Sequence, residues 1–443
     1  MWPPTFFVSA AAVFLWSGGA VYGQELPHVG HIDFQGRFLV AISDADMVSS
    51  AYTDGQIGPP QGSDTLSIIQ ITDNPETWKV SNVSVGNAVV GPPTAMTVTP
   101  NGRYAIVVET LGPRSSANPN TTMSELPSSR KITVIDLIDL DRPAVVDTVE
   151  GFLQPSTVSV NAAGDLVAVT HTLAGSGVET PVALYQFQQG KLSLLSTPAI
   201  PDWPSGNLLM DAAFHPELDI LALTDYSQPR LTLVRVIRQG SETKLERWGN
   251  SLSLETAPYT AKFTPDGRYV LSNAMYVGPD IEAPRGTISS IRLEASQEQN
   301  GDPHHSIVSR AEVGVMPEGL AVSPDGLWAV TANLERSTPA LDSPSQGFFS
   351  SLSLLRVEPA NGTLSTVGTY AFDGILPEGV VFDSSSRFVA STTFDQYDGR
   401  IPGGSIDMWR ISGDHADPTR VEFVKTSVSV PVVRGPHVIA MVG

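Results

Sequence analysis

The 443-residue chain contains no cysteine. Disulfides, thiolate metal sites, iron–sulfur clusters and cysteine nucleophiles are therefore excluded. The sequence also lacks the His/Met or Cys ligand spacings of haem and copper proteins. It has no Gly-x-Ser-x-Gly elbow, no His-Glu-x-x-His motif and no phosphate-binding P-loop. What these absences leave open is chemistry based on carboxylates and histidine, or binding without catalysis.

Basic residues are scarce. The chain has 26 Lys and Arg against 46 Asp and Glu, which gives a formal net charge of −20. A surface this acidic repels phosphate backbones, so we expect no nucleic-acid partner.

Long hydrophobic runs are also scarce, and the longest lies at residues 6–16. It is too short to cross a bilayer, which takes about 20 residues, but it suits the apolar region of a signal peptide. Small residues follow it up to Gly23, although no Lys or Arg precedes it. We predict a signal peptide at 1–23, a single domain at 24–443, a secreted or periplasmic location and no membrane insertion after cleavage.

No long helical period is visible, whereas 38 Gly and 35 Pro supply many turns. The clearest unit is 315–335, VMPEGLAVSPDGLWAVTANLE. An apolar run follows a proline, Ser-Pro-Asp-Gly makes a tight turn, and a second apolar run ends at Asn333. This pattern predicts two short antiparallel strands.

The same unit recurs along the chain, anchored on a proline and on a turn residue nine positions later. The pairs are Pro27/Gly36, Pro93/Gly102, Pro155/Gly164, the degenerate Leu209/Leu218, Pro258/Gly267, Pro317/Gly326 and Pro377/Ser386, and a truncated copy starts at Pro436.

Two further alternating runs follow each copy, and the period is roughly 50 to 65 residues, as in propeller blades. We therefore predict an all-β fold, a seven-bladed β-propeller of four-stranded antiparallel blades. A string of two-sheet sandwiches is the alternative, which the constant anchor disfavours. Because an open ring would leave two unpaired sheet edges, pairing of the N- and C-terminal strands should close it. Pro27-His28-Val29 or Pro436-His437-Val438 could supply the closing inner strand.

The sequence Pro-Glu-Gly-Leu-Ala-Val-Ser-Pro-Asp-Gly at 317–326, followed by Ala-Val-Thr-Ala-Asn at 329–333, resembles the YVTN repeat of lactonase-like β-propellers. The resemblance covers nearly the whole chain from Pro27 and implies a propeller that opens a lactone or binds a ligand. Lactonase-like propellers often carry Gly-Pro-Arg-His; here residues 434–437 read Arg-Gly-Pro-His.

Long loops should leave the second strand of most blades, on the face that also carries the start of each first strand. Sites are usually built on such loop-rich faces. Two rings of residues point to this face: the residue after each anchor proline and the residue near the end of each second strand. The candidates for catalysis are Glu318, Glu378 and His437. The candidates for pocket lining are His28, Glu109, His171, Asp211, Asp225, Asn273 and Asn333.

Two carboxylates and an imidazole on consecutive blades could act as an acid/base pair or hold a divalent cation. The alternative is that Pro-Glu-Gly is turn chemistry of the repeat, with the glutamates partly solvated and salt-bridged. We expect a monomeric lactonase-like hydrolase of a small lactone or sugar-derived ligand that requires no cofactor, with a cation at Glu318 and Glu378 left open. The alternative function is a non-catalytic propeller that binds a small molecule or a surface protein.

Overall fold

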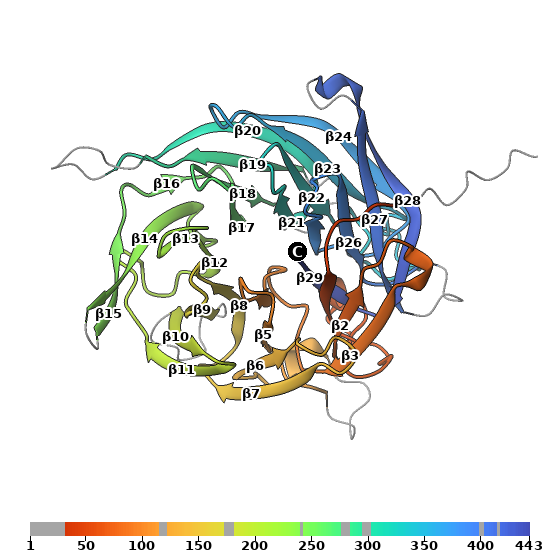
Figure 1. Ribbon diagram of the computed structural model, residues 1–443, viewed down its shortest axis with the longest axis horizontal. Coiled ribbons are helices and arrows are strands. Elements are labelled where there is room, and N and C mark those ends of the chain that lie inside the picture. The colour runs from red at the N-terminus through yellow and green to blue at the C-terminus, as the bar shows by residue number, and fades with distance from the viewer. Residues whose placement is uncertain are drawn as a thin grey trace, which may run out of the picture.

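The chain forms a ring of seven four-stranded antiparallel sheets (Figure 1). The computed structural model describes residues 32–114, 122–171, 181–239, 242–275, 284–294, 303–397, 403–413 and 417–443. The proposed signal peptide and His28 lie outside these ranges. Within the described ranges, no helix has the length and apolarity needed to cross a membrane.

Each blade runs from an inner strand at the axis to an outer strand at the rim. From inside to outside the first three blades are β29 (Pro436–Val442), β1 (Phe38–Ser43), β2 (Thr65–Gln70) and β3 (Lys79–Ser84); β4 (Met96–Val98), β5 (Tyr104–Val108), β6 (Lys131–Asp136) and β7 (Ala144–Glu150); and β8 (Pro155–Val160), β9 (Leu166–His171), β10 (Val182–Gln188) and β11 (Lys191–Ser196).

The other four blades follow the same order. They are β12 (Leu209–Phe214), β13 (Ile220–Asp225), β14 (Arg230–Gln239) and β15 (Glu242–Arg247), with β16 (Leu252–Ser253) beside β14; β17 (Pro258–Phe263), β18 (Tyr269–Ala274), β19 (Arg285–Arg292) and β20 (Ser306–Val315); β21 (Pro317–Val322), β22 (Trp328–Asn333), β23 (Ser350–Val357) and β24 (Leu364–Phe372); and β25 (Val380–Phe382), β26 (Phe388–Thr393), β27 (Gly404–Gly413) and β28 (Val421–Val432). The described helices are short: α1 (Ala51–Asp54) and the 3₁₀ turns η1 (Pro75–Thr77), η2 (Met123–Glu125) and η3 (Pro418–Arg420).

The burial of the strands explains why the second run of each repeat is apolar throughout. Every residue of β1, β9, β13, β18, β22 and β26 is buried, because both faces of these strands pack against other blades. In outer strands such as β3, by contrast, exposed residues alternate with half-buried ones along most of the strand. Aromatic side chains fill the space between the last two blades, where Trp409 stacks on Phe423 at 5.1 Å between ring centroids and meets Phe372 edge-on.

The predicted turn between the first and second strands is present. Gly326 adopts φ 70°, a left-handed conformation that glycine reaches without a steric penalty. In the seventh copy Ser386 occupies the same position with φ 61° and its side chain is buried. Its hydroxyl accepts a hydrogen bond from the Asp325 N–H at 3.1 Å, which ties this turn to the preceding blade.

Strand β29 closes the ring and answers the question left open by the sequence. It pairs antiparallel with β1, from Val442 opposite Phe38 to Pro436 opposite Ser43. Residues 32–35 of the first copy form no strand, since the C-terminal segment occupies the inner position. β29 also contacts the inner strands on both sides, β25 and β4.

The long loops meet on one face, as predicted from the repeat. The loop after β1 pairs with the loop after β5 through a bridge between Gln56 and Thr122, and Thr53 Oγ1 lies 3.2 Å from Thr338 Oγ1 in the loop after β22. Their apolar side chains form one buried cluster that includes Met47 and Leu334. The loop-rich face is therefore a packed layer, which we call the cap layer.

Candidate functional site

A β-bulge marks the same position in at least five of the seven inner strands. In β21 the register passes from Pro317 opposite Asn333 to Gly319 opposite Ala332, so that Glu318 is the extra residue. The equivalent extra residues are Ser156 in β8, Met210 in β12 and His437 in β29, and β17 has the same irregularity at residues 259–260. Since a bulge re-aims its side chain, the extra residue in each of these five strands points away from the regular sheet face.

Side chains on the second strand accept hydrogen bonds from backbone N–H groups near the bulges of the first strand. Thr392 Oγ1 accepts the Gly379 N–H at 2.9 Å, and Thr224 Oγ1 accepts the Asp211 N–H at 2.8 Å. In the fifth blade the amide oxygen of Asn273 does the same for the Thr260 N–H. Asn273 also donates to the Glu318 carbonyl at 2.7 Å and so joins its blade to the next. The bulges are therefore a stable feature of the fold.

Glu318, Glu378 and His437 come together at the top of three consecutive inner strands. The carboxyl groups of Glu318 and Glu378 are close enough for each to shift the pKa of the other. His437 Nδ1 lies 3.8 Å from Glu378 Oε2, and its Nε2 bonds Asn87 Oδ1 at 2.8 Å. All three side chains are almost completely buried, at 1 % exposure or less. We call Glu318 and Glu378 the carboxyl dyad.

Burial sets the protonation of this group. It raises the pKa of Glu318 to about 8 and raises the pKa of Glu378 well above its ordinary value, with the Glu318 charge adding to the effect on Glu378. Burial lowers the pKa of His437 to about 3. The imidazole is therefore neutral at pH 7, and its 3.8 Å approach to Glu378 is a polar contact instead of an ion pair.

Two tyrosines lie near the dyad, Tyr52 in the cap layer and Tyr259 on the inner strand β17. The Tyr52 hydroxyl, from α1, donates to Glu378 Oε1 at 3.0 Å and also contacts the Val89 carbonyl oxygen. Tyr259 follows the anchor proline of β17 and is buried. Burial raises the pKa of both tyrosines well above 10, and the charges of Glu378 and Glu318 add to it. Both hydroxyls are therefore neutral donors beside the dyad.

The glycine of Pro-Glu-Gly has its own role. A Cβ on Gly319 would come within 1.9 Å of the Glu378 carbonyl oxygen, and one on Gly379 would meet the His437 carbonyl oxygen at 3.0 Å. Glycine at these positions lets the three inner strands approach closely enough for their bulged side chains to touch.

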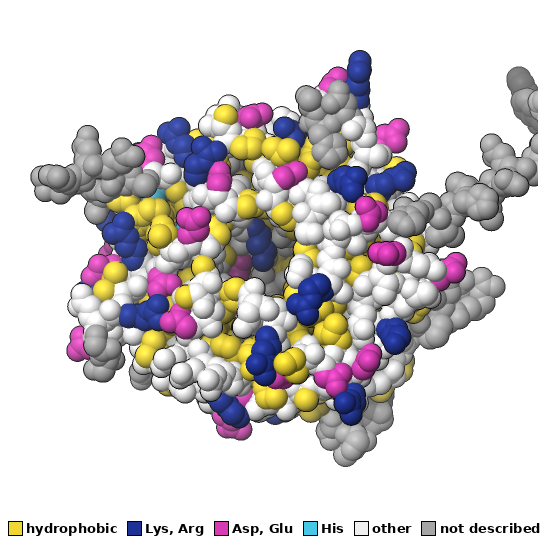
Figure 2. Space-filling view, in the orientation of Figure 1, with side chains coloured by type: hydrophobic (Ala, Val, Ile, Leu, Met, Phe, Trp, Pro, Cys, Tyr) yellow, Lys and Arg dark blue, Asp and Glu magenta, His cyan; other side chains and the backbone are white. Residues whose placement is uncertain are grey.

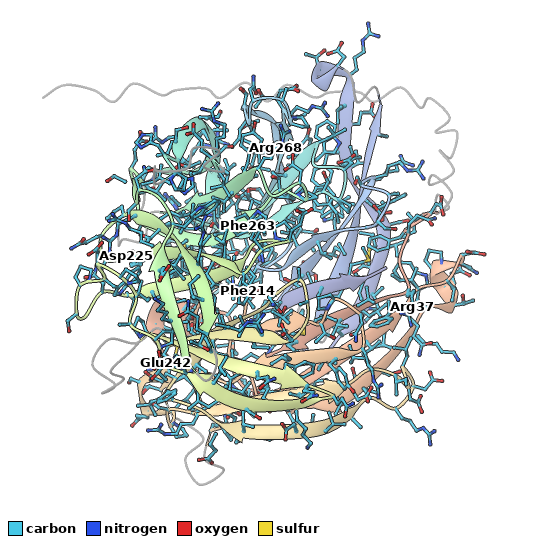
Figure 3. All side chains as sticks on the ribbon, turned by 60° about the vertical axis from the view of Figure 1, so that its left-hand side comes forward. Arg37, Phe214, Asp225, Glu242, Phe263 and Arg268 are labelled. Atoms are coloured by element: carbon cyan, nitrogen blue, oxygen red, sulfur yellow. The ribbon has the colours of Figure 1, made fainter. Side chains whose placement is uncertain are left out.

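The other predicted lining residues have different surroundings. Asp211 is buried near the axis and accepts hydrogen bonds from the Ala261 N–H at 3.0 Å and the Thr94 hydroxyl at 3.3 Å. Asp225 pairs with Arg230 at 2.8 Å and binds Asn207. In Figure 3 it lies at the side of the molecule, whereas Phe214 and Phe263 on the inner strands β12 and β17 lie toward the middle.

Glu109, Asn333 and His171 are also buried, and their side chains bind or pack against residues other than the dyad. Glu109 pairs with Lys131 at 3.3 Å, and the Asn333 amide donates to the hydroxyl of Ser351 at 2.9 Å. The His171 ring packs edge-on against Phe152, and burial lowers the pKa of His171 to about 4. Of the predicted residues, the structure thus brings Glu318, Glu378 and His437 into one contact network and ties Asn273 to it through the backbone.

Sequence reasoning missed Tyr52 and Asn87, which complete the contacts of the dyad. Both lie in connections outside the repeat, after β1 and after β3. The repeat alignment carries no information about these connections. The length of the loop after β1 was the available signal.

Comparisons with known proteins establish the fold alone. No protein-family model matches the chain, and no curated protein is similar to it in sequence. Among solved structures, it resembles the periplasmic gluconolactonase PpgL of Pseudomonas aeruginosa, with a TM-score of 0.60 and 16 % identity over 91 % of this chain and 99 % of that one.

A candidate 6-phosphogluconolactonase from Bacteroides fragilis gives a TM-score of 0.59 and 14 % identity over 92 % of this chain and 98 % of that one. A hypothetical selenium-binding protein from Sulfolobus tokodaii gives 0.57 and 11 % identity over 92 % and 94 %. The chain is thus a lactonase-like seven-bladed propeller in architecture, a fold that proteins with other described roles share.

Proposed function

We propose that this protein hydrolyses a small lactone at the carboxyl dyad. The observation that carries the proposal is the convergence of Glu318, Glu378 and His437 from three blades, with pKa values shifted by burial and by each other. Strongly shifted carboxyl pairs are typical of acid/base sites. The solved gluconolactonase of similar fold supports a lactone as the substrate class.

The reaction uses one carboxylate and one carboxylic acid. Glu318 in its ionised form is the base and takes a proton from water as the water oxygen attacks the lactone carbonyl carbon; because its pKa is about 8, the ionised form increases as the pH rises toward 8. Glu378, whose pKa is raised well above its ordinary value by burial and by the Glu318 charge, is the acid and protonates the ring oxygen as the C–O bond breaks. The products are a hydroxy acid and a dyad that returns to its starting state by proton exchange. The reaction requires no cofactor.

The neutral Tyr52 hydroxyl, which bonds Glu378, is the group we assign to donate to the oxygen on which negative charge develops. Because the dyad is buried beneath Tyr52, substrate must displace the loop of residues 44–63 before it can bind. Such loops commonly close over a reaction and exclude water.

The same burial favours the second candidate function, a propeller that binds without catalysis. In that case the dyad is a protonated structural pair, and the cap layer is the recognition surface. Figure 2 shows one face of the ring with a hollow at its centre, and hollows of this kind also serve binding proteins.

A lactone panel distinguishes the two. The purified chain is assayed by pH-stat against γ- and δ-lactones, including aldonolactones, with Glu318→Gln, Glu378→Gln and the exposed control Glu422→Gln. Catalysis predicts that each dyad variant loses about 10²-fold or more in kcat/KM, and that the control keeps full activity. Absence of turnover across the panel, or full activity in Glu318→Gln, contradicts the proposed site.

We also propose export as a monomer after cleavage at Gly23. N-terminal sequencing of the mature protein and light scattering test this pair of proposals. An intact Met1 or a dimer would contradict them.

A further inference from the structure

Three aspartates outside the dyad meet at the base of the loop that carries Tyr52. Asp44 directly follows β1 and Asp64 directly precedes β2, so the antiparallel pairing of Ser43 with Thr65 places them opposite each other. Asp46 is two residues further along the loop. One carboxylate oxygen from each of the three lies within 4.8 Å of the others.

Backbone N–H groups hold these carboxylates in place. The Val89 N–H donates to Asp44 Oδ2 at 2.9 Å, and the Ala45 N–H donates to Asp64 Oδ1 at 3.0 Å. Hydrogen bonds of this kind orient a carboxylate and leave its remaining lone pairs available, as in the outer shell of metal sites.

The nearby arginines engage the backbone. Arg114 donates from its guanidinium to the Gly58 carbonyl at 2.7 Å, and Arg434 donates to the Pro59 carbonyl at 2.7 Å. Among the described residues, neither guanidinium forms an ion pair with the three carboxylates. The arginines shape the loop, and the charges of Asp44 and Asp46 act on Arg434 without an ion pair between them.

Asp44 provides an observation of a different kind. Its side chain is 2 % exposed, and its Oδ1 accepts no hydrogen bond from any residue within the described ranges. A buried polar atom without a partner calls for a ligand or water. Three carboxylates that repel each other are what a cation would stabilise.

We propose that Asp44, Asp46 and Asp64 bind one divalent cation, with Ca²⁺ as the preferred ion. Carboxylate oxygens are the ligands of Ca²⁺, which accepts irregular geometry and completes its shell with carbonyls or water. A cavity of about 460 Å³, lined in part by Asp46 and Asp64, lies beside the cluster and gives an ion and its water a way in.

The cation would fasten the loop of residues 44–63, and with it Tyr52, at the loop's narrow base. Its site also touches the dyad's surroundings, because Asn87 donates its N–H to Asp64 at 3.4 Å and bonds His437 through its side chain. The role is structural and is independent of whether the dyad catalyses a reaction.

Calorimetry on the full chain, stripped with EDTA and dialysed, tests the proposal with Ca²⁺, Mg²⁺ and Mn²⁺ as chloride salts. We expect one Ca²⁺ per chain, a rise in melting temperature on binding, and at least tenfold weaker binding in Asp46→Asn. The control is Asp54→Asn, an exposed aspartate of the same loop, which should bind Ca²⁺ as the parent does.

Absence of both heat and melting shift in the parent protein with all three ions overturns the proposal, as does unchanged binding in Asp46→Asn. If Asp46→Asn does not fold, the parent's titration still decides. Because substrate is absent throughout, failure of cation binding and failure of lactone hydrolysis remain separate results.

Discussion

Replacement of Glu318 by Gln should flatten the pH dependence of stability above neutral pH. In the folded protein the pKa of Glu318 is about 8, whereas an ordinary glutamate has a pKa of 4.5. A group whose pKa is raised by folding contributes stability below its unfolded pKa and loses it as the pH rises through the folded pKa. The unfolded chain has already released this proton at pH 6.5, and the folded chain keeps it until about pH 8.

The size of the effect follows from these two values. For each proton that the folded chain retains and the unfolded chain has released, a rise of one pH unit in this window lowers the free energy of unfolding by up to about 1.4 kcal/mol. Between pH 6.5 and 8 the Glu318 carboxyl alone should therefore lower the free energy of unfolding by about 1.5 kcal/mol. His437 contributes little here and equally in the three proteins, because its pKa is lowered to about 3 and its effect on stability fades as the pH rises above its unfolded value of 6.5.

Urea titrations of the parent, Glu318→Gln and Glu422→Gln at pH 6.5 and pH 8 measure the slope. The parent and the exposed control should lose stability in parallel, and Glu318→Gln should lose about 1.5 kcal/mol less. The difference in stability loss between the parent and Glu318→Gln should be larger if Glu378 also ionises more readily without its charged neighbour. Equal slopes in all three proteins would refute the account of a buried, proton-retaining dyad.

Three further changes test the scaffold around the dyad. Deletion of residues 436–443 should remove several buried apolar side chains, at about 2 kcal/mol each, and with them most of the ring's net stability. Thermal melting followed by circular dichroism should show loss of the folded transition in this variant. Deletion of Gly443 alone should change the melting temperature little. Gly319→Ala places a Cβ 1.9 Å from the Glu378 carbonyl oxygen and should cost about 3 kcal/mol or more in urea titration, and an unchanged midpoint would contradict the close approach. Tyr52→Phe removes one hydrogen bond to the dyad and should cost about 1 kcal/mol at pH 7, and a larger loss of kcat than of stability would indicate a role in the reaction.

The repeat made the fold predictable from sequence, because each anchor proline and turn glycine mark one strand–turn–strand unit. It also predicted that Glu318, Glu378 and His437 occupy equivalent positions on consecutive blades. Their direct contact depends on the β-bulges, which a pattern of apolar residues does not encode. The residues near the ends of the second strands were less informative, since a buried polar side chain such as Asn333 can hydrogen-bond within its own blade.

The cluster of Asp44, Asp46 and Asp64 could not be predicted from the sequence for another reason. Asp44 and Asp64 are twenty residues apart, and only the pairing of β1 with β2 brings them together. The chain is rich in acidic residues, so two aspartates at 44 and 46 do not stand out. Loop residues are placed by contacts between loops, and these follow from the complete fold.

Closure by β29 also orders events during biosynthesis. A chain is made from its N-terminus, and β29 is the last strand of the ring to be synthesised. His437, which touches Glu378, therefore reaches the dyad only after the other six inner strands exist. A prematurely terminated product would lack both the closing strand and this imidazole. A truncated chain would leave the inner edge of β1 unpaired, and an unpaired strand edge can pair with other chains.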